Sequence, residues 1–321
     1  MSLALLSLAR RALPVHIFTS QFEARHQRGR RSRGSIRHGV ALLCGFGNPE
    51  PSGSRWATPA LSNSTSGEVS PCVRTQWDYT ALADAYLKRP DYADAAIDAM
   101  LAITGARKRD KICDVGAGLA HLTLMLAARG MDVTAVEPND AMRANGIKRT
   151  KELTNVRWHE GTGEQTGQPS QSFDIVTFGS SFNVCDRPAA LKETARILRP
   201  GGWFACLWNH RQLDDPIQMQ IEANIKDRVR DYSYGSRRED QTAIINASGL
   251  FGSVVHLDSR VVHEQTIEEC VEAWRSHATL QRQAGAAFGD VVAGIEEYLL
   301  SLKRPKIQIP YSTNIWAAQL H

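Results

Sequence analysis

Short apolar runs alternate with segments of helical period along the chain from residue 77 onwards. A first helix is expected from apolar side chains three and four residues apart, beginning near Tyr92 and ending at Gly105. Parallel strands are expected at 111–115, 132–137, 156–159, 173–178 and 203–208. Because strands that alternate with helices form parallel sheets covered on both faces, this pattern predicts an α/β fold with a doubly wound sheet. Ligands of such sheets bind at the carboxyl ends of the strands.

The pattern becomes looser after residue 209. It predicts a polar helix at about 216–230, a charged turn at 234–240, a short helix through Ile244, a strand at 253–262, helices at about 266–281 and 289–302, and a last strand at 306–320. The sheet is therefore expected to have seven strands, mostly parallel. The segments at about 212–240 and 266–302 are expected to form helical lid elements. Arg237 and Arg238 in the charged turn are interpreted as solvated, in preference to contacts with an acidic substrate.

The first 74 residues differ in composition from the domain expected at 75–321. They contain ten arginines, no lysine and three acidic residues, which leaves 28 of the 38 basic and 31 of the 34 acidic residues in the rest of the chain. They show no sustained period, which predicts disorder. An Arg-rich, Ser-rich start with a short helix at 1–13 also fits a transit peptide, and a start codon assigned too early is an equally simple interpretation. A nucleic-acid arm is disfavoured because no aromatic residue lies between Arg25 and Arg37.

The overall composition is typical of a globular protein, with 42% apolar and 22% charged residues. No run approaches the roughly 20 apolar residues needed to span a bilayer, so no membrane association is expected. The six cysteines form no Cys-x-x-Cys pair, and no histidines lie at the spacing of zinc ligands. No metal site or disulfide framework is therefore expected, and a reducing, cytoplasmic location is favoured. A mitochondrial or other organellar location is the alternative if residues 1–74 are a transit peptide.

A glycine loop, Asp114-Val115-Gly116-Ala117-Gly118-Leu119-Ala120, lies between the first expected strand and the next helix. Glycine allows the backbone to approach a ligand closely, and the start of a helix offers free amide groups. An NAD-type Gly-x-Gly-x-x-Gly loop would have glycine where this chain has His121. It would not need an acid two residues before the first glycine, whereas a cofactor with a cationic amino-acid group would. The loop alone leaves both kinds of cofactor open.

The loop resembles motif I of the class I S-adenosylmethionine (SAM)-dependent methyltransferases, Asp/Glu-x-Gly-x-Gly-x-Gly, with Ala120 in place of the last glycine. In that family the loop holds the amino-acid part of the cofactor, and an acid at the end of the second strand holds the ribose hydroxyls. Glu137 occupies this second place. An acid there also occurs in NAD proteins, so it indicates nucleoside binding without selecting the cofactor.

Three further segments are similar to this family and favour SAM. Gly161-Thr162-Gly163-Glu164 resembles Gly-Asp-Ala-Glu, which flanks the adenine, with Thr162 in place of the usual aspartate. Phe173-Asp174-Ile175-Val176 resembles the fourth-strand motif, which leads to Gly179 and Ser180 near the sulfonium. Leu198-Arg199-Pro200-Gly201-Gly202 matches the Leu-x-Pro-Gly-Gly turn before the fifth strand. The resemblance covers about residues 77–211 and implies a class I methyltransferase fold.

The stretch from Tyr86 to Tyr92 resembles the Tyr-x-x-Arg-Pro-x-Tyr segment of a small-molecule branch, the type 11-like methyltransferases, where it closes over the cofactor. The resemblance implies SAM as cofactor and the following cofactor-binding residues: Tyr86, Arg89, Asp114, Gly116, Ala117, Gly118, Glu137, Pro138, Met142, Thr162, Gly163, Gly179 and Ser180.

A small molecule is the expected methyl acceptor. The sulfonium already activates the methyl group, so the protein mainly has to align the acceptor and exclude water. His210 is the candidate base because it follows a strand and has an ordinary pKa near neutrality. The expected substrate contacts are Tyr79, Phe182, Asn183, Trp208 and Arg211.

Other functions remain open at this point. Methylation of an adenine amino group in nucleic acid is disfavoured, because Gly179-Ser180-Ser181-Phe182 stands where such enzymes have Asn/Asp-Pro-Pro-Tyr/Phe. An RNA methyltransferase that uses the arginine-rich arm, a SAM-binding protein without catalysis and an NAD oxidoreductase are the alternatives.

Overall fold

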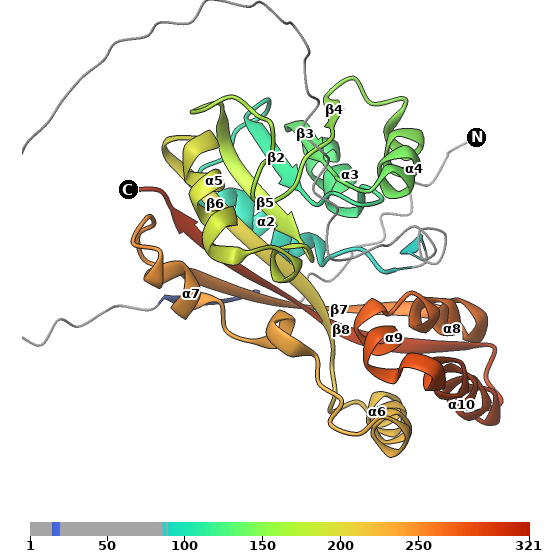
Figure 1. Ribbon diagram of the computed structural model, residues 1–321. Helices are drawn as coiled ribbons and strands as arrows, with labels where there is room; N and C mark the ends of the chain where they lie inside the picture. The colour runs from blue at the N-terminus through green and yellow to red at the C-terminus, as the bar shows by residue number, and fades with distance from the viewer. Residues whose placement is uncertain (1–14, 20–85, 88) are drawn as a thin grey trace, which may run out of the picture. The chain divides into compact units, whose positions relative to one another are not determined.

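The structure is a computed structural model that describes residues 15–19, 86–87 and 89–321 (Figure 1). Tyr79, the predicted helix at 1–13 and most of the segment 1–74 lie outside the described residues. The sheet has the strand order β1-β7-β8-β6-β5-β2-β3-β4. These strands are β1 (Val15–Thr19), β2 (Lys111–Val115), β3 (Asp132–Val136), β4 (Val156–His159), β5 (Phe173–Gly179), β6 (Leu198–Arg211), β7 (Val255–Thr266) and β8 (Lys306–Gln319).

The doubly wound α/β sheet predicted from the alternating pattern is confirmed. Strands β4, β3, β2, β5 and β6 pair in parallel, and β8 pairs antiparallel with both β6 and β7. The carboxyl ends of β2, β3, β5 and β6 therefore share one edge of the sheet, which is where ligands of such sheets bind.

The sheet has eight strands, so the prediction of seven is wrong by one. The additional strand is β1, whose Val15 pairs with Ser259 of β7. Without β1, the edge of β7 that faces away from β8 would present unpaired backbone N–H and C=O groups. Pairing with β1 gives these groups hydrogen-bond partners. The prediction of disorder for residues 1–74 is accordingly wrong at Val15–Thr19.

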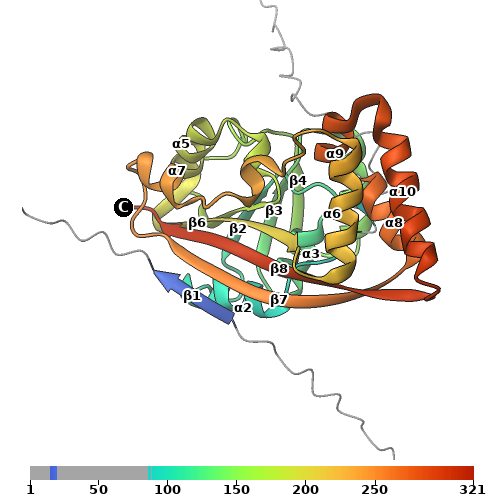
Figure 2. The same ribbon diagram turned by 90° about the horizontal axis from the view of Figure 1, so that it is seen from below.

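Helices cover both faces of the sheet (Figure 2). They are α2 (Asp94–Ile103), α3 (His121–Ala128), α4 (Asp140–Thr150), α5 (Arg187–Ile197), α6 (Pro216–Arg228), α7 (Thr242–Ala247), α8 (Ile267–Arg275), α9 (Ala278–Ala284) and α10 (Phe288–Ser301), with short 3-10 helices η2 (Phe182–Val184), η3 (Gly235–Arg238) and η4 (Gly285–Ala287). The buried side chains of α2 and α3 pack against one face of the sheet. Those of α5 and α7 pack against the other face.

Four phenylalanine rings pack together in the core between the sheet and the helices α5 and α7. Phe204 lies 5.8 Å from Phe178, 5.3 Å from Phe182 and 5.6 Å from Phe251, measured between ring centroids. Tilted and edge-to-face rings at these separations are favourable beyond their apolar burial. This group joins β5, β6, η2 and the segment after α7, where Phe251 forms an isolated β-bridge with Leu320, into one packed layer.

The late helices pack on one another and on the extension of β7 and β8 beyond the end of β6 (Figures 1 and 2). Residues 266–281 were predicted as one helix but form α8 and α9, separated at Ser276 and His277. The division has a local cause, because the His277 side chain accepts a hydrogen bond from the backbone N–H of Leu280 at 3.1 Å and thereby starts α9. None of the described helices combines the length and apolar character needed to cross a membrane.

Replacing Phe204 by alanine should lower the free energy of unfolding by about 3–5 kcal/mol, because the side chain is fully buried among three other rings. Urea denaturation would measure the change. Leu300→Ala on α10 is the control, since Leu300 is 60% exposed and its loss should change the same quantity by about 0.5 kcal/mol or less. Equal effects of the two substitutions would contradict the assignment of Phe204 to the core.

Candidate functional site

The glycine loop is held against the end of β3 by its own backbone. The N–H groups of Gly116 and Ala117 both donate to the carbonyl oxygen of Val136, at 2.8 and 3.1 Å. Gly116 has φ 68° and Gly118 has φ 54°, a left-handed region that glycine enters without strain. A side chain at Gly116 would place its Cβ 2.4 Å from that of Ser181. The positions of both glycines therefore depend on the absence of a side chain.

The carboxylate of Glu137 joins the loop to the end of β3. One oxygen accepts the N–H of Gly118 and the other accepts the N–H of Asn139, each at 2.9 Å. The side chain is 7% exposed, and burial raises its pKa while the two backbone hydrogen bonds oppose that rise. A carboxylate can accept about four hydrogen bonds, so acceptor capacity remains beyond these two bonds.

Asp114 lies beneath the loop and is 1% exposed. Its two oxygens accept hydrogen bonds from the hydroxyl groups of Thr123 at 2.6 Å and Thr177 at 3.1 Å. Burial raises the pKa of this carboxyl to about 6, against the lowering effect of the two hydroxyl donors. The side chain thus connects β2 to α3 and β5. A direct contact with the amino group of a cofactor stays a prediction.

The segment before α2 crosses the carboxyl edge of the sheet. His121 contacts the carboxylate of Asp91 at 3.0 Å and the carbonyl oxygen of Tyr86 at 3.1 Å. The amide of Asn209, on β6, donates to the carbonyl oxygen of Asp91 at 2.8 Å, and the hydroxyl of Tyr92 lies 2.9 Å from that of Ser180. This segment therefore spans the ends of β2, β5 and β6.

Most predicted cofactor residues come together along this edge. Tyr86 packs against Leu119 of the loop and Met142 of α4, and the Arg89 guanidinium lies 3.6 Å from the centre of the Tyr86 ring. Pro138 follows Glu137 directly and leads into α4. A side chain at position 179 would press on Tyr92, since a Cβ added to Gly179 would lie 3.1 Å from the Tyr92 hydroxyl.

Thr162 and Gly163 follow the neighbouring strand, β4. The Thr162 hydroxyl accepts the N–H of Gln165 at 3.1 Å, and the Thr162 N–H donates to the carbonyl of Gln165 at 2.9 Å. A Cβ at Gly163 would lie 2.4 Å from the sulfur of Cys185. Both residues therefore shape a tight turn at the site edge, and their contact with an adenine stays a prediction.

Two of the expected substrate contacts are core residues. Phe182 is fully buried and stacks edge-to-face with Phe178 and Phe204. Trp208 is also buried, and its indole N–H donates to the Asn183 side-chain oxygen at 2.9 Å. The sequence placed both near a strand end but did not indicate which face of the sheet they occupy. The predictions for Phe182 and Trp208 are therefore wrong, and Asn183 serves Trp208.

His210 is poorly suited to act as a base near neutral pH. Its Nε2 lies 2.8 Å from the carbonyl oxygen of Arg237, which assigns the proton to Nε2. Burial, together with the positive charges of Arg238 and Arg237, lowers its pKa to about 3. The sequence-based role was inferred from the ordinary pKa of histidine, which this environment changes.

Four arginines gather beyond the end of β6, here called the arginine cluster: Arg89, Arg211, Arg237 and Arg238. The Arg211 guanidinium lies 4.1 Å from the centre of the Trp274 ring, and that of Arg238 lies 4.2 Å from the centre of the Tyr234 ring. Burial lowers the pKa values of Arg237 and Arg238, that of Arg237 to about 10. The interpretation of Arg237 and Arg238 as solvated is therefore wrong, because η3 places Arg237 beside His277 and Arg238 against Tyr234.

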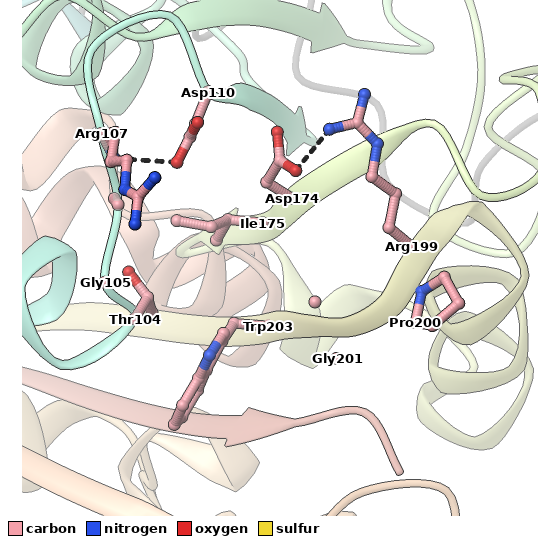
Figure 3. Close-up of a pocket in the computed structure, with 12 residues that line it drawn as sticks. Thr104, Gly105, Arg107, Asp110, Asp174, Ile175, Arg199, Pro200, Gly201 and Trp203 are labelled. Carbon is pink, nitrogen blue, oxygen red and sulfur yellow. Dashed lines mark hydrogen bonds and ion pairs between the residues drawn. The ribbon is translucent and has the colours of Figure 1, made fainter.

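A pocket of about 320 Å³ lies at the opposite edge of the sheet (Figure 3). Its lining includes Asp110, Asp174, Arg199 and Trp203, near the amino ends of β2 and β5 and the beginning of β6. The Arg199 guanidinium pairs with Asp174 at 2.5 Å. Asp174 of the family-like strand motif thus supports this edge, far along the strands from the glycine loop. Among the described residues no group of three or more His, Cys, Asp or Glu side chains is arranged to hold a metal ion.

The raised pKa of Asp114 predicts a pH-dependent stability. The folded state holds this proton up to a pH of about 6, whereas the unfolded chain releases it near 3.8, so the stability contributed by this group falls as the pH rises from about 4 to about 6. Relative to wild type, Asp114→Asn should therefore gain about 1–3 kcal/mol of unfolding free energy across that range. Urea denaturation of both proteins at several pH values tests this, and a difference that does not change with pH would contradict it.

The His210 ring should remain neutral, with its proton on Nε2, from a pH of about 5 to about 8, because its pKa is near 3. Nitrogen-15 chemical shifts of the imidazole would show the tautomer and any titration. His210→Asn identifies the signal by its loss. A midpoint between pH 5 and 8 for that signal would refute the placement of the ring against Arg237.

Part of the sequence that forms this edge matches a known protein family. The sequence pattern of a family described as a methyltransferase domain matches residues 113–206, from β2 to β6. An uncharacterised methyltransferase of Mycobacterium tuberculosis is 36% identical over 127 residues, which are 38% of this chain and 48% of that protein. A demethylmenaquinone methyltransferase of Staphylococcus aureus is 36% identical over 107 residues, which are 32% of this chain and 44% of that protein.

The uncharacterised methyltransferase YcgJ of Bacillus subtilis is 30% identical over 138 residues, 42% of this chain and 54% of that protein. Its crystal structure aligns with a TM-score of 0.47 at 17% identity over 71% of this chain and 98% of that chain. The chain spans about half the length of the curated relatives it matches. The matched segment contains the glycine loop, Glu137 and the end of β5. Residues 113–206 of this chain are thus similar to a methyltransferase domain.

Proposed function

We propose that this protein transfers a methyl group from SAM to a small-molecule acceptor. The observation that carries the proposal is the buried Glu137 carboxylate, which is bonded to the glycine loop within the segment that matches the methyltransferase domain. The sequence signal for SAM and the geometry of this carboxylate concern the same few residues. The acceptor would lie past the ends of β5 and β6, where α6, α8, α9 and α10 pack together.

The residues at this edge fit the cofactor. The remaining acceptor capacity of Glu137 suits a pair of ribose hydroxyls. The glycine loop, left-handed at Gly116 and Gly118, allows a ligand to approach its backbone. Tyr86 and Met142, which pack on Leu119, would contact the cofactor from the side of α4 and the leading segment.

SAM would supply a methyl group that its positively charged sulfur already activates. The protein then has to orient the acceptor and keep water away. The hydrogen bonds of Asp91 and Tyr92 hold the segment before α2 across the carboxyl edge of the sheet. Ser180, with φ 61°, lies in the turn that follows β5. His210 is not assigned as a base, because its Nε2–H donates to the carbonyl oxygen of Arg237 and its pKa is low.

S-adenosylhomocysteine should bind the full chain, and Glu137→Ala should weaken that binding by about 10- to 100-fold, since charge-assisted hydrogen bonds to the ribose would be lost. Isothermal titration calorimetry measures the affinity. Glu152→Gln is the matched control, because Glu152 is exposed in the loop before β4, and it should bind as wild type does. Titration of NADH should give no binding.

A wild-type affinity in Glu137→Ala would refute the proposed position of the ribose. Binding of NADH in place of S-adenosylhomocysteine would refute the proposed cofactor. Thermal melting of the variants distinguishes loss of the ribose contact from loss of the fold, because Glu137 also links the loop to β3.

A further inference from the structure

The arginine cluster gathers positive charge where the proposed methyl acceptor would lie. Among the described residues no carboxylate forms an ion pair with Arg89, Arg211, Arg237 or Arg238. Glu222, a buried acid of α6, accepts a hydrogen bond from the Tyr234 hydroxyl and lies 3.8 Å from the Lys226 ammonium. Buried cations without a paired anion are costly, which makes such a group a candidate ligand site.

Two of the four arginines are held by backbone carbonyls. Arg89 donates to the carbonyl of Ser276 at 2.7 Å, and Arg238 donates to the carbonyl of Arg211 at 3.0 Å. Arg211 instead lies over the rings of Trp274 and Tyr311, and its buried Nε has no hydrogen-bond partner among the described residues. The buried Nε of Arg237 likewise has no such partner in the described part of the chain. Arg238 also leaves its buried Nε without a partner among the described residues, but Arg211 and Arg237 differ from Arg89 and Arg238 in that neither guanidinium is bonded to a backbone carbonyl there.

His277 adds a donor to the same place. Its Nδ1 accepts the N–H of Leu280 at 3.1 Å, so in the neutral ring the proton lies on Nε2. Burial lowers the pKa of His277 well below its usual value, which keeps the ring neutral. Nε2 lies 3.3 Å from Nη1 of Arg237. Two N–H donors thus face each other, an arrangement that an acceptor shared by both would satisfy.

The indole of Trp274 completes the group. It stacks on His277 with 5.3 Å between ring centroids, and its buried N–H has no hydrogen-bond partner among the described residues. Arg211, Arg237, Trp274 and His277, here called the donor site, therefore present N–H groups and no carboxylate. A guanidinium matches the oxygens of a carboxylate or phosphate particularly well.

We propose that the donor site binds an anionic oxygen group, a carboxylate or a phosphate, of the methyl acceptor. The identification of that molecule as the acceptor rests on the methyl transfer proposed above. Arg89 connects the donor site to the proposed cofactor site, because it bonds Ser276 beside His277 and lies over Tyr86, which packs on the glycine loop. An anion bound here would hold the rest of the molecule toward the ends of β5 and β6.

Calorimetric titration of the full chain with citrate and, separately, with inorganic phosphate tests the proposal, with sodium chloride at equal ionic strength as the reference. At least one of the two anions should bind wild type, and Arg211→Gln and Arg237→Gln should each weaken that binding by about 10- to 100-fold. Arg237→Lys should retain part of the affinity. Preference for citrate indicates a carboxylate ligand, and preference for phosphate indicates a phosphate ligand.

Arg304→Gln is the control for loss of charge, since Arg304 is exposed in the turn before β8, and it should bind the anions as wild type does. Wild type that binds neither anion, or equal affinities in wild type and in both glutamine variants, would overturn the proposal. If Arg211→Gln does not fold, as judged by thermal melting, Arg237→Gln and Arg237→Lys decide.

Titration of the same samples with S-adenosylhomocysteine separates the two proposals. All folded variants should bind it with the affinity of wild type, because none of the substituted residues lies in the glycine loop or on β3. Anion binding without S-adenosylhomocysteine binding would refute the proposed methyl transfer and keep the anion site. The reverse result would refute the anion site alone.

Discussion

The edge of the sheet at the carboxyl ends of its strands depends on the hydrogen bonds of the buried Asp114 carboxyl group. This group stands at the end of β2 and accepts hydrogen bonds from Thr123 on α3 and Thr177 on β5. Three elements that meet only through the tertiary fold are thereby tied under the glycine loop. The burial that makes this linkage strong also makes the ionised form of the carboxyl less favourable, and the rise of its pKa measures that cost. The two threonine hydroxyls reduce the cost without removing it.

A second set of contacts depends on these hydrogen bonds of Asp114. Glu137 connects the glycine loop to the end of β3, and the segment around Asp91 is held from above by His121 and Asn209. The Thr313 hydroxyl, on β8, accepts the N–H of Ala93 at 2.8 Å and donates to Asn209 at 2.5 Å. The residue before α2 and a residue of the last strand thus help to position the same edge. Main-chain groups provide many of these contacts, so their geometry depends on the path of the backbone more than on the identity of individual side chains.

The helices α6, α8, α9 and α10 give the far side of this edge a different chemistry. Near the glycine loop the buried side chains include the acids Asp114 and Glu137, whereas beyond β6 positive charge predominates, with arginines and neutral histidines beside the single buried acid named above, Glu222. Aromatic rings of Tyr234, Trp274 and Tyr311 lie against the guanidinium groups and compensate part of their desolvation. The fold therefore places opposite charges at the two ends of one edge. Such a separation orients a ligand that carries unlike groups at its two ends.

The sequence alone determined the doubly wound α/β class, the loop from Asp114 to Ala120 and the place of Glu137, because strand period, glycine spacing and the position of an acid at a strand end are local properties of the chain. It did not determine which face of the sheet Phe182 and Trp208 occupy, since side-chain direction there depends on packing against α5 and β8. It also could not show that β1 pairs with β7, because those segments are far apart in the sequence. Only the tertiary structure brought Arg89, Arg211, Arg237 and His277 together, from four separate segments. Burial, with the charges of Arg238 and Arg237, lowers the pKa of His210, and contacts with His277 and Arg211 hold a charged turn that resembles a solvated loop in sequence. The pKa of a side chain and its role depend on neighbours that the sequence does not name.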